Sequence, residues 1–279
     1  MIKIKNKFII IVPTYNAAST ILETLDSIDN QRYPDLGIII RNDMSDDNTI
    51  EIVRDHYKIC NKSSHVIHNN RDVVLIDNDI KYYSAGNIYD SVLKYVGNPQ
   101  SIIGVVDGDD KLIDLSALAK IEAVYDKFDS WLVWSQHRLK AQVGNSNKGY
   151  SMHLPGDEEV YTTRNYWAVS HFRTCRSWLF SLILLKDVLD PFTSGSFCKI
   201  AGDAALMYPI IEMCGNKKSY FLDEELYLYN NSSGLNEHAL YQDDVVKYTN
   251  HIRGKHEIYN QLHQHTIPFK TKEIIDNLF

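Results

Sequence analysis

Residues 102–110 read Ile-Ile-Gly-Val-Val-Asp-Gly-Asp-Asp, an apolar run that ends in three carboxylates within four positions. The run at residues 102–106 shows no alternation of apolar and polar side chains, which is typical of a strand buried on both faces. Residues 8–12, bounded by Pro13, and residues 37–40 have the same character. Strands of this kind occur in parallel sheets that helices cover on both sides. The sequence therefore predicts an α/β fold.

Helical patterns lie between these strands. Residues 19–30 place apolar side chains at Ile21, Leu25 and Ile28, and similar stripes recur in residues 47–57 and 84–96. Residues 65–68 are expected to form a short third strand. This alternation of strands and helices indicates a mostly parallel, Rossmann-type sheet flanked by helices.

The second half of the chain is less regular, and its elements are predicted from shorter patterns. We expect helices at residues 115–128 and 203–213, strands at 131–139 and 221–229, and a long loop at 141–159. The tail carries an apolar stripe at Tyr248, Ile252, Ile258 and Leu262, which predicts a helical extension. The interpretation divides the chain into residues 1–110 and 111–238, two halves of one domain, and a C-terminal helical extension at 239–279.

Composition excludes several classes of protein. The chain has 279 residues, with 29 basic and 36 acidic side chains, so it is not expected to bind nucleic acid through phosphates. No apolar stretch approaches the ~20 residues that a membrane span requires. The cysteines at positions 60, 175, 198 and 214 form no close pair, so neither a zinc knuckle nor a disulfide framework is expected. A reducing, cytoplasmic location fits this pattern best.

The acidic turn Asp107-Gly108-Asp109-Asp110 carries the sharpest chemical signal. It follows a buried strand, and ligands of open parallel sheets bind at the carboxyl ends of the strands. Like charges at ~4 Å repel by roughly 1 kcal/mol in water and more in a cleft, so a divalent cation would stabilise the turn. Oxygen ligands favour Mg²⁺ or Mn²⁺ over zinc. The alternative is a solvated turn without a ligand.

Two other loops follow strands at the same edge. In the loop 42–49, Asp43 is placed to accept a hydrogen bond from a base, whereas Asp47 and Asn48 are expected to cap the next helix. In the loop Pro13-Thr14-Tyr15-Asn16, Tyr15 is placed to stack on a base and Thr14 to bind a base or ribose. This loop contains no glycine, which argues against a dinucleotide-binding motif and a P-loop.

Together these loops resemble the family 2 glycosyltransferases of the GT-A fold. The matching motifs are Val12-Pro13-Thr14-Tyr15-Asn16, the loop 42–49, Ala85-Gly86-Asn87 and Asp107-Gly108-Asp109. Three positions depart from the family pattern: Asn42 and Met44 stand where Asp and Gly are usual, and Gly86 where Arg is common. Residues 170–180, 202–213 and 226–230 also resemble a subgroup found in bacteria and large viruses. The likeness covers about residues 8–235 and leaves the tail unexplained.

The resemblance implies an inverting enzyme that moves a sugar from a UDP-sugar to an acceptor hydroxyl, with Mn²⁺ or Mg²⁺ as cofactor. Residues 1–110 would bind the donor, and residues 111–238 would hold the acceptor and the catalytic base. The residues expected to bind the nucleotide sugar are Pro13, Thr14, Tyr15, Asn16, Asp43, Asn87, Asp107 and Gly108. Those expected at the metal are Asp109, Asp107, Asp110 and His238. His171, Arg173 and Arg176 are candidates for phosphate or acceptor contacts, of which one or two are expected to face the site.

Asp203 occupies the position of the family's general base, at the start of a predicted helix. Its alternative role is an N-cap, and the two roles are compatible. The acceptor class stays open between polysaccharide, glycan and hydroxylated, collagen-like protein. Two other functions stay open as well: a degenerate, non-catalytic sugar- or protein-binding module, and a sugar-1-phosphate nucleotidyltransferase. The tail is expected either to form a homodimer or to pack on its own domain.

Overall fold

The computed structural model describes residues 3–143, 146–156, 164, 167–232, 242–254 and 258–262. Within these ranges the strands form one sheet, in the order β3-β4-β2-β1-β5-β9-β7-β10-β6, and β8 pairs with β7. The strands are β1 (Phe8–Thr14), β2 (Leu36–Asn42), β3 (Ser64–His68), β4 (Arg71–Asp77), β5 (Ile102–Val105), β6 (Lys111–Leu112), β7 (Leu132–Val143), β8 (Ser146–Lys148), β9 (Arg173–Arg176) and β10 (Ser219–Tyr229). The helices are α1 (Ile21–Asp29), α2 (Thr49–Tyr57), α3 (Tyr83–Tyr95), α4 (Ala117–Phe128), the 3₁₀ helix η1 (Ser177–Leu182), α6 (Leu185–Val188), α7 (Gly202–Lys218) and α9 (Gln242–Arg253).

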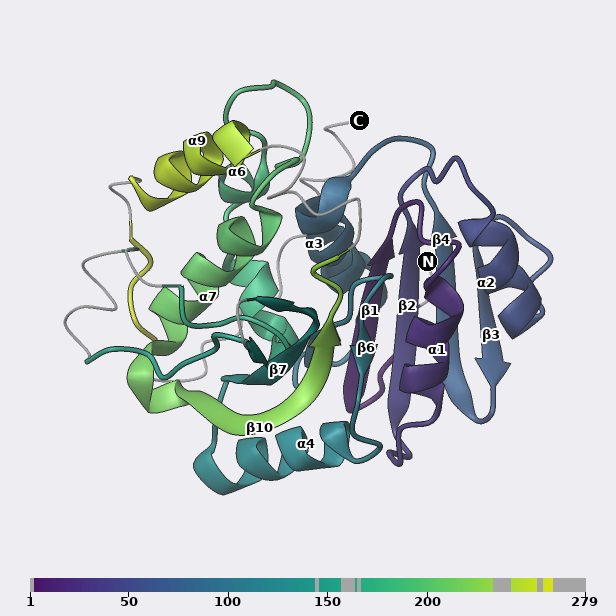
Figure 1. Cartoon of the computed structure of the whole chain (residues 1–279), viewed down its shortest axis with the longest axis horizontal. Coiled ribbons are helices and arrows are strands. Elements are labelled where there is room, and N and C mark those ends of the chain that lie inside the picture. The colour runs from purple at the N-terminus through teal and green to yellow at the C-terminus, as the bar shows by residue number, and fades with distance from the viewer. Residues whose placement is uncertain are drawn as a thin grey trace.

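Strand β1 lies at the centre of the parallel part of the sheet. It pairs in parallel with β2 on one side, where Phe8 faces Leu36, and with β5 on the other, where Phe8 faces Ile102. Strand β4 continues the parallel set beyond β2. Strand β9 runs antiparallel to both β5 and β7, and β7 and β10 pair in parallel. The expected fold, a mostly parallel GT-A-like sheet flanked by helices, is confirmed (Figure 1).

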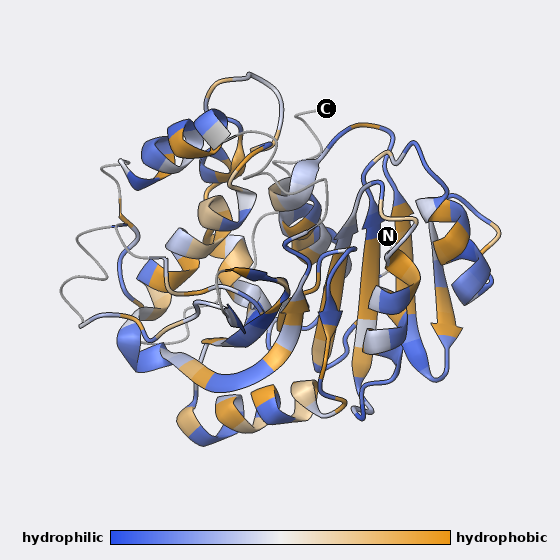
Figure 2. Ribbon diagram, in the orientation of Figure 1, coloured by the Kyte–Doolittle hydropathy of each residue, from blue (hydrophilic) through white to orange (hydrophobic). Residues whose placement is uncertain are grey.

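The apolar strands have buried side chains on both faces, as their sequence pattern predicts. Every residue of β1 is buried. Alternate side chains point to opposite faces of a strand, so Ile9 and Ile11 join a core with α3 and α7, whereas Phe8, Ile10 and Val12 join a core with α1, α2 and α4. The central strands are accordingly the most continuously hydrophobic ribbons in Figure 2, while the helices alternate.

One strand of the parallel set was not predicted from the sequence. Residues 65–68 were expected to be the third strand, but β3 is an antiparallel edge strand, and β4 is the strand that pairs with β2. Asn69 and Asn70 connect the two, and both have positive φ angles, 49° and 61°. Such angles suit the tight turns that join hairpin strands, and asparagine tolerates them.

Three boundaries in the second half also differ from expectation. Strand β7 continues to Val143 and pairs with β8, so part of the expected loop at 141–159 is a hairpin. Helix α7 extends to Lys218. In the tail, α9 is helical as predicted, but Ile258 and Leu262 lie outside any helix, and residues 239–241, 255–257 and 263–279 lie outside the described residues.

The apolar stripe of α9 is buried against the same chain. Tyr248 and Ile252 are 1% and 3% exposed, and both belong to the core that contains α7. The hydroxyl of Tyr248 donates a 2.7 Å hydrogen bond to Asp190. Packing on its own domain therefore accounts for the apolar stripe that suggested a homodimer, and dimerisation has no structural support here.

All four cysteines are free thiols. None of the helices within the described ranges has both the length and the apolar character that crossing a bilayer demands.

Gly86 on α3 is required by a close approach. A Cβ at this position would lie 2.4 Å from two ring atoms of Phe197, a fully buried side chain that stacks on Tyr82. We predict that Gly86→Ala lowers the free energy of unfolding by about 1–3 kcal/mol, because the core must move to admit one methyl group. Urea denaturation measures the change. Gly156→Ala is the control, since nothing lies within 4 Å of its added Cβ, and equal stability of the two variants would contradict the prediction.

Candidate active site

A cleft of about 500 Å³ opens at the carboxyl ends of β1, β2 and β5. This volume lies within the range of small-molecule sites. Residues of the first half form one wall and residues of the second half form the other. The cleft brings together most of the predicted site residues: Pro13, Thr14, Tyr15, Asp43, Asn87, Asp107, Gly108, Asp109 and Asp203.

Three candidate residues lie outside the cleft. Asn16 ties two loops together beside the cleft, because its Oδ1 accepts a 2.8 Å hydrogen bond from the Asp46 amide. Asp110 lies behind the cleft wall, and Arg176 turns away, with its guanidinium 4.7 Å from the centre of the Tyr125 ring. His238 is outside the described residues.

Asp43 is a buried carboxylate held by three hydrogen bonds. Its Oδ1 accepts from the Tyr82 amide and from Asn78 Nδ2, both at 2.8 Å, and its Oδ2 accepts from the Tyr83 amide at 2.9 Å. Asn78 Nδ2 also donates to Asn87 Oδ1 at 2.8 Å. These contacts join the ends of β2 and β4 to the start of α3. They fix the direction of the carboxylate at the inner end of the cleft.

Tyr15 presents only part of its ring to the cleft. The ammonium group of Lys81 lies 3.1 Å from the ring centre and also donates a 2.6 Å hydrogen bond to the Asp43 carbonyl. Burial lowers the pKa of Lys81, although the nearby Asp43 and Asp46 oppose that shift. A planar group stacking on Tyr15 would therefore have to use the ring face away from Lys81.

The acidic turn is shaped by two contacts that its sequence does not reveal. A Cβ on Gly108 would lie 2.4 Å from Thr14 Oγ1, so only glycine allows β1 and the turn to approach this closely. Asp110 is 2% exposed and accepts two 2.7 Å hydrogen bonds, from the Tyr227 hydroxyl and from the Asn230 amide. Burial, followed by repulsion from Asp107 and Asp109, raises the pKa of Asp110 well above its ordinary value.

His171 completes a group with Asp107 and Asp110 in which one ligand atom from each residue lies within 4.8 Å of the others. Its ring is stacked between Tyr227 and Tyr229, at centroid distances of 5.0 and 4.7 Å. Burial and the charge of Arg173 lower the pKa of His171, so the imidazole is neutral at neutral pH. Its Nε2 accepts a 3.2 Å hydrogen bond from Arg173, which a metal bound at that atom would replace.

The donor chemistry of this group fits the expected cation. Two carboxylates and a neutral imidazole suit Mn²⁺, and Asp109 lines the same cleft. Burial opposes the ionisation of Asp107, but the neighbouring His171 and Arg173 outweigh burial and lower its pKa. From the sequence, His171 was a candidate for phosphate or acceptor contacts. Nothing in the order of the chain shows that His171, just before β9, lies beside the acidic turn.

Asp203 lies on the opposite wall and is 40% exposed. It is the second residue of α7, whose N-cap is Ala201, so Asp203 does not take the alternative role of N-cap. Its Oδ1 accepts a 2.7 Å hydrogen bond from the Ala204 amide, and its Oδ2 lies 3.2 Å from Arg173 Nη1. Arg173, which also contacts His171, therefore links the possible base to the acidic turn.

Sequence reasoning missed the contribution of the tail. Val245, Thr249 and Arg253 line the cleft from α9, and Arg253 Nε donates a 3.1 Å hydrogen bond to the Tyr208 hydroxyl. These three residues recur every four positions, which is the spacing of one helix face. No family motif covers them. Tyr150 and Tyr229 also line the cleft without having been singled out as binding residues, and Trp167 lines it as well.

A buried ion pair holds α9 at the cleft. Arg164 and Glu212 are joined by two hydrogen bonds, of 2.6 and 3.0 Å, and their side chains are 4% and 1% exposed. Arg164 Nη1 also donates to the Ile252 carbonyl at 2.8 Å. Removing one partner of such a pair would leave a buried charge without compensation.

Comparison with known proteins agrees with this geometry. Residues 9–189 match the family model described as Glycosyl transferase family 2. Among curated proteins, no sequence matches the chain. Three solved structures share the fold at low sequence identity. S. aureus TarS 1–349 in complex with UDP-GlcNAc is 20% identical, with a TM-score of 0.62, over 88% of this chain and 65% of that one.

The other two structures are a mannosyltransferase and a synthase. PcManGT from Pyrobaculum calidifontis, in complex with GDP-Man and Mn²⁺, is 17% identical, with a TM-score of 0.56, over 85% of this chain and 60% of that one. The synthase is glucosyl-3-phosphoglycerate synthase from Mycobacterium tuberculosis, in complex with Mn²⁺, UDP and glucosyl-3-phosphoglycerate. It is 12% identical, with a TM-score of 0.56, over 90% of this chain and 81% of that one.

The fold is GT-A-like, and its acidic cleft lies at the carboxyl ends of the parallel strands. Since the family model matches well over half of its residues, the chain belongs to glycosyl transferase family 2, as its motifs predicted. The chain spans 65% of the TarS fragment that it matches.

Tyr227 holds the acidic turn through its hydroxyl group, which accepts from the Asp107 amide at 3.2 Å and donates to Asp110 at 2.7 Å. We predict that Tyr227→Phe lowers the free energy of unfolding by about 1–3 kcal/mol, because two buried polar groups lose their partner. Urea denaturation would measure this. Tyr220→Phe on the same strand is the control, since its hydroxyl bonds no described residue. An unchanged midpoint for Tyr227→Phe would rule out this role.

Proposed function

We propose that the protein transfers a sugar from a UDP-sugar to an acceptor hydroxyl with inversion at the anomeric carbon. The observation that carries the proposal is the single cleft in which the turn 107–110 faces Asp203. Fold relatives crystallised with UDP-GlcNAc and with UDP support the choice of donor. One relative holds GDP-Man, so the preference for uracil is part of the proposal.

The nucleotide would lie against the first-half wall. Asp43 faces the position of the base, where an ionised carboxylate accepts N–H hydrogen bonds. Thr14 Oγ1 is buried and has no hydrogen-bond partner, so a base or ribose hydroxyl could pair with it. Tyr15 would stack on the base with the ring face that Lys81 leaves open.

The donor's diphosphate would lie at the acidic turn. Asp107, Asp109 and His171 would hold Mn²⁺ or Mg²⁺ there, with Asp110 behind them. When bound, the cation neutralises charge on the leaving diphosphate. Tyr227 and Asn230 keep Asp110 in place through hydrogen bonds, so the turn keeps its shape while three carboxylates lie close together.

Asp203 would act as the general base. Its carboxylate is open to the cleft, and Arg173 fixes the direction of Oδ2. The acceptor hydroxyl would lose its proton to Asp203 while its oxygen attacks the anomeric carbon from the side opposite the diphosphate. This single displacement inverts the configuration at that carbon.

The acceptor would enter between the second-half wall and α9. Trp167 offers aromatic surface of the kind that sugars contact, and Thr249 and Arg253 offer hydrogen bonds. These groups suit the hydroxyl-rich acceptors expected from the sequence, whether polysaccharide, glycan or hydroxylated protein.

The departures from the family pattern are accommodated locally, which weakens the case for a degenerate binding module. Asn42 Nδ2 donates to Asp77 at 2.7 Å, and its Oδ1 accepts from the Ser45 hydroxyl at 2.6 Å. Met44 adopts the left-handed backbone, φ 59°, that glycine would otherwise supply. The ring of Phe197 fills the space beside Gly86. A nucleotidyltransferase remains disfavoured, because no glycine-rich loop follows β1.

We predict that Asp109→Ala reduces the affinity for UDP in the presence of Mn²⁺ to its metal-free value, because a ligand of the bridging cation is lost. Calorimetric titration with UDP, with and without Mn²⁺, measures this. Asp126→Asn removes the same charge from the exposed face of α4 and should behave as the wild type. Undiminished Mn²⁺-dependent affinity in Asp109→Ala would refute the metal assignment.

For Asp203→Asn we predict unchanged binding of the donor and a fall in turnover of about 10²–10⁴-fold, because an amide cannot take up the acceptor's proton. A screen of nucleotide sugars for Mn²⁺-dependent nucleotide release first identifies the donor, and kcat for transfer is then compared between variants. Asp126→Asn again serves as the control. Near-wild-type turnover by Asp203→Asn would place the base elsewhere.

A further inference from the structure

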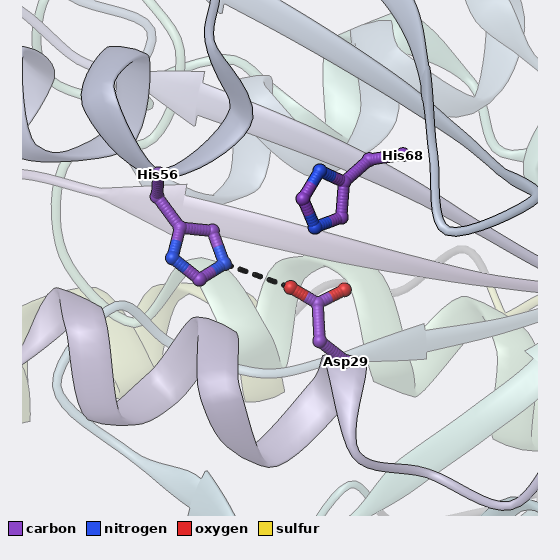
Figure 3. A group of neighbouring side chains, drawn as sticks. All are labelled: Asp29, His56 and His68. Carbon is purple, nitrogen blue, oxygen red and sulfur yellow. Dashed lines mark hydrogen bonds and ion pairs between the residues drawn. The ribbon is translucent and has the colours of Figure 1, made fainter.

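A second group of metal-ligating side chains lies far from the cleft. Asp29 ends α1, His56 lies in the last turn of α2, and His68 ends β3, so three separate elements meet here (Figure 3). One ligand atom from each residue lies within 4.8 Å of the others, and all three residues are half-buried. Helices α1 and α2 end at the amino-terminal edge of the parallel strands, opposite the edge that carries the cleft.

The Asp29 carboxylate is only partly satisfied by the protein. Its Oδ2 accepts a 3.1 Å hydrogen bond from the Tyr57 hydroxyl and lies 2.8 Å from His56 Nε2. Its Oδ1 is buried and has no hydrogen-bond partner. Arg71 Nη1 is 3.7 Å from Oδ1, but the guanidinium donates its hydrogen bonds to the carbonyls of Ile28, Asp29 and Gln31. One buried oxygen of this carboxylate therefore has no hydrogen-bond donor.

Two features of the surroundings favour a cation at this point, while the guanidinium of Arg71, 3.7 Å from Asp29 Oδ1, opposes it. The carboxyl-terminal turns of α1 and α2 both end here, and helix C-termini carry partial negative charge. The His56 and His68 rings are 5.8 Å apart, and Figure 3 shows His68 with a ring nitrogen directed toward the Asp29 carboxylate. Tyr57 packs edge-on against both rings, at 4.6 and 5.1 Å, and so limits their rotation.

We propose that Asp29, His56 and His68 form a second divalent-metal site, of the Zn²⁺ type, that fastens α1, α2 and β3 together. Two imidazoles and one carboxylate are typical zinc ligands, whereas Mg²⁺ prefers oxygen ligands alone. Zinc bonds of about 2.0–2.1 Å place tetrahedral ligand atoms roughly 3.3 Å apart. The pair His56 Nε2 and Asp29 Oδ2 must therefore open slightly from 2.8 Å. Water would take the fourth position.

The test uses Co²⁺ as a coloured probe for this site. The whole chain, treated with chelator, is titrated with Co²⁺ in excess Mg²⁺, which is added to fill the site proposed at the turn 107–110. We expect one equivalent of Co²⁺ to give the strong visible absorption of tetrahedral coordination and Zn²⁺ to displace it. Absence of that absorption would overturn the proposal.

Matched variants locate the bound ion. His56→Phe and His68→Phe keep a ring against Tyr57 but remove the ligand nitrogen, so each should abolish the tetrahedral spectrum. His65→Phe is the control, because His65 Nε2 contacts Asp72 at 2.6 Å in the same hairpin without a third ligand. Asp109→Ala should keep the spectrum. Loss in Asp109→Ala with retention in His68→Phe would assign the ion to the cleft and overturn the proposal.

Thermal unfolding gives an independent reading. Zn²⁺ that binds only the folded state raises the unfolding temperature. We expect Zn²⁺, in excess Mg²⁺, to raise it for the wild type and for His65→Phe but not for His68→Phe. If His68→Phe does not fold, Asp29→Asn replaces it, since asparagine keeps the size of the side chain. An equal rise in wild type and ligand variant would refute the site.

Discussion

The hydrogen bonds that hold Asp110 connect the two halves of the molecule. Asp110 belongs to the turn after β5, and both of its partners, Tyr227 and the Asn230 amide, belong to β10 and the residue that follows it. They hold Asp110 in a partly buried turn although Asp107 and Asp109 repel it. With them, Asp107 and Asp109 face the cleft at a fixed distance from the second-half wall. The acidic turn is thus a structural joint as well as the proposed binding site for a cation.

Much of this architecture could be predicted from local sequence. Strands β1 and β5 were recognisable because uninterrupted apolar runs are the pattern of strands buried on both faces, and residues 8–14 are indeed buried throughout. The loops after these strands carry the polar side chains that line the cleft. Strand β4 was missed because it begins with Arg71 and Asp72 and follows a two-residue Asn turn, so its first residues resemble a loop.

The rest depends on contacts between segments far apart in the chain. His171 joins Asp107 and Asp110 only because β9 lies antiparallel to β5, a pairing that no local pattern reports. Asp203 was found through a family motif, yet its salt bridge to Arg173 required the fold. Arg253 was not predicted to line the cleft. Helix α9 lies at the cleft because of the buried ion pair between Arg164 and Glu212, and neither residue indicates that role in the sequence.

Helix α9 supplies a cleft wall although it has no place in the central sheet. The side chains proposed to recognise the nucleotide come from loops that also fix strand ends, so exchanging them disturbs the scaffold. Thr249 carries no such double duty, whereas Arg253 also bonds the Tyr208 hydroxyl. Selection can therefore remodel the proposed acceptor site by altering one short peripheral segment, while the residues proposed to bind the donor are inherited unchanged.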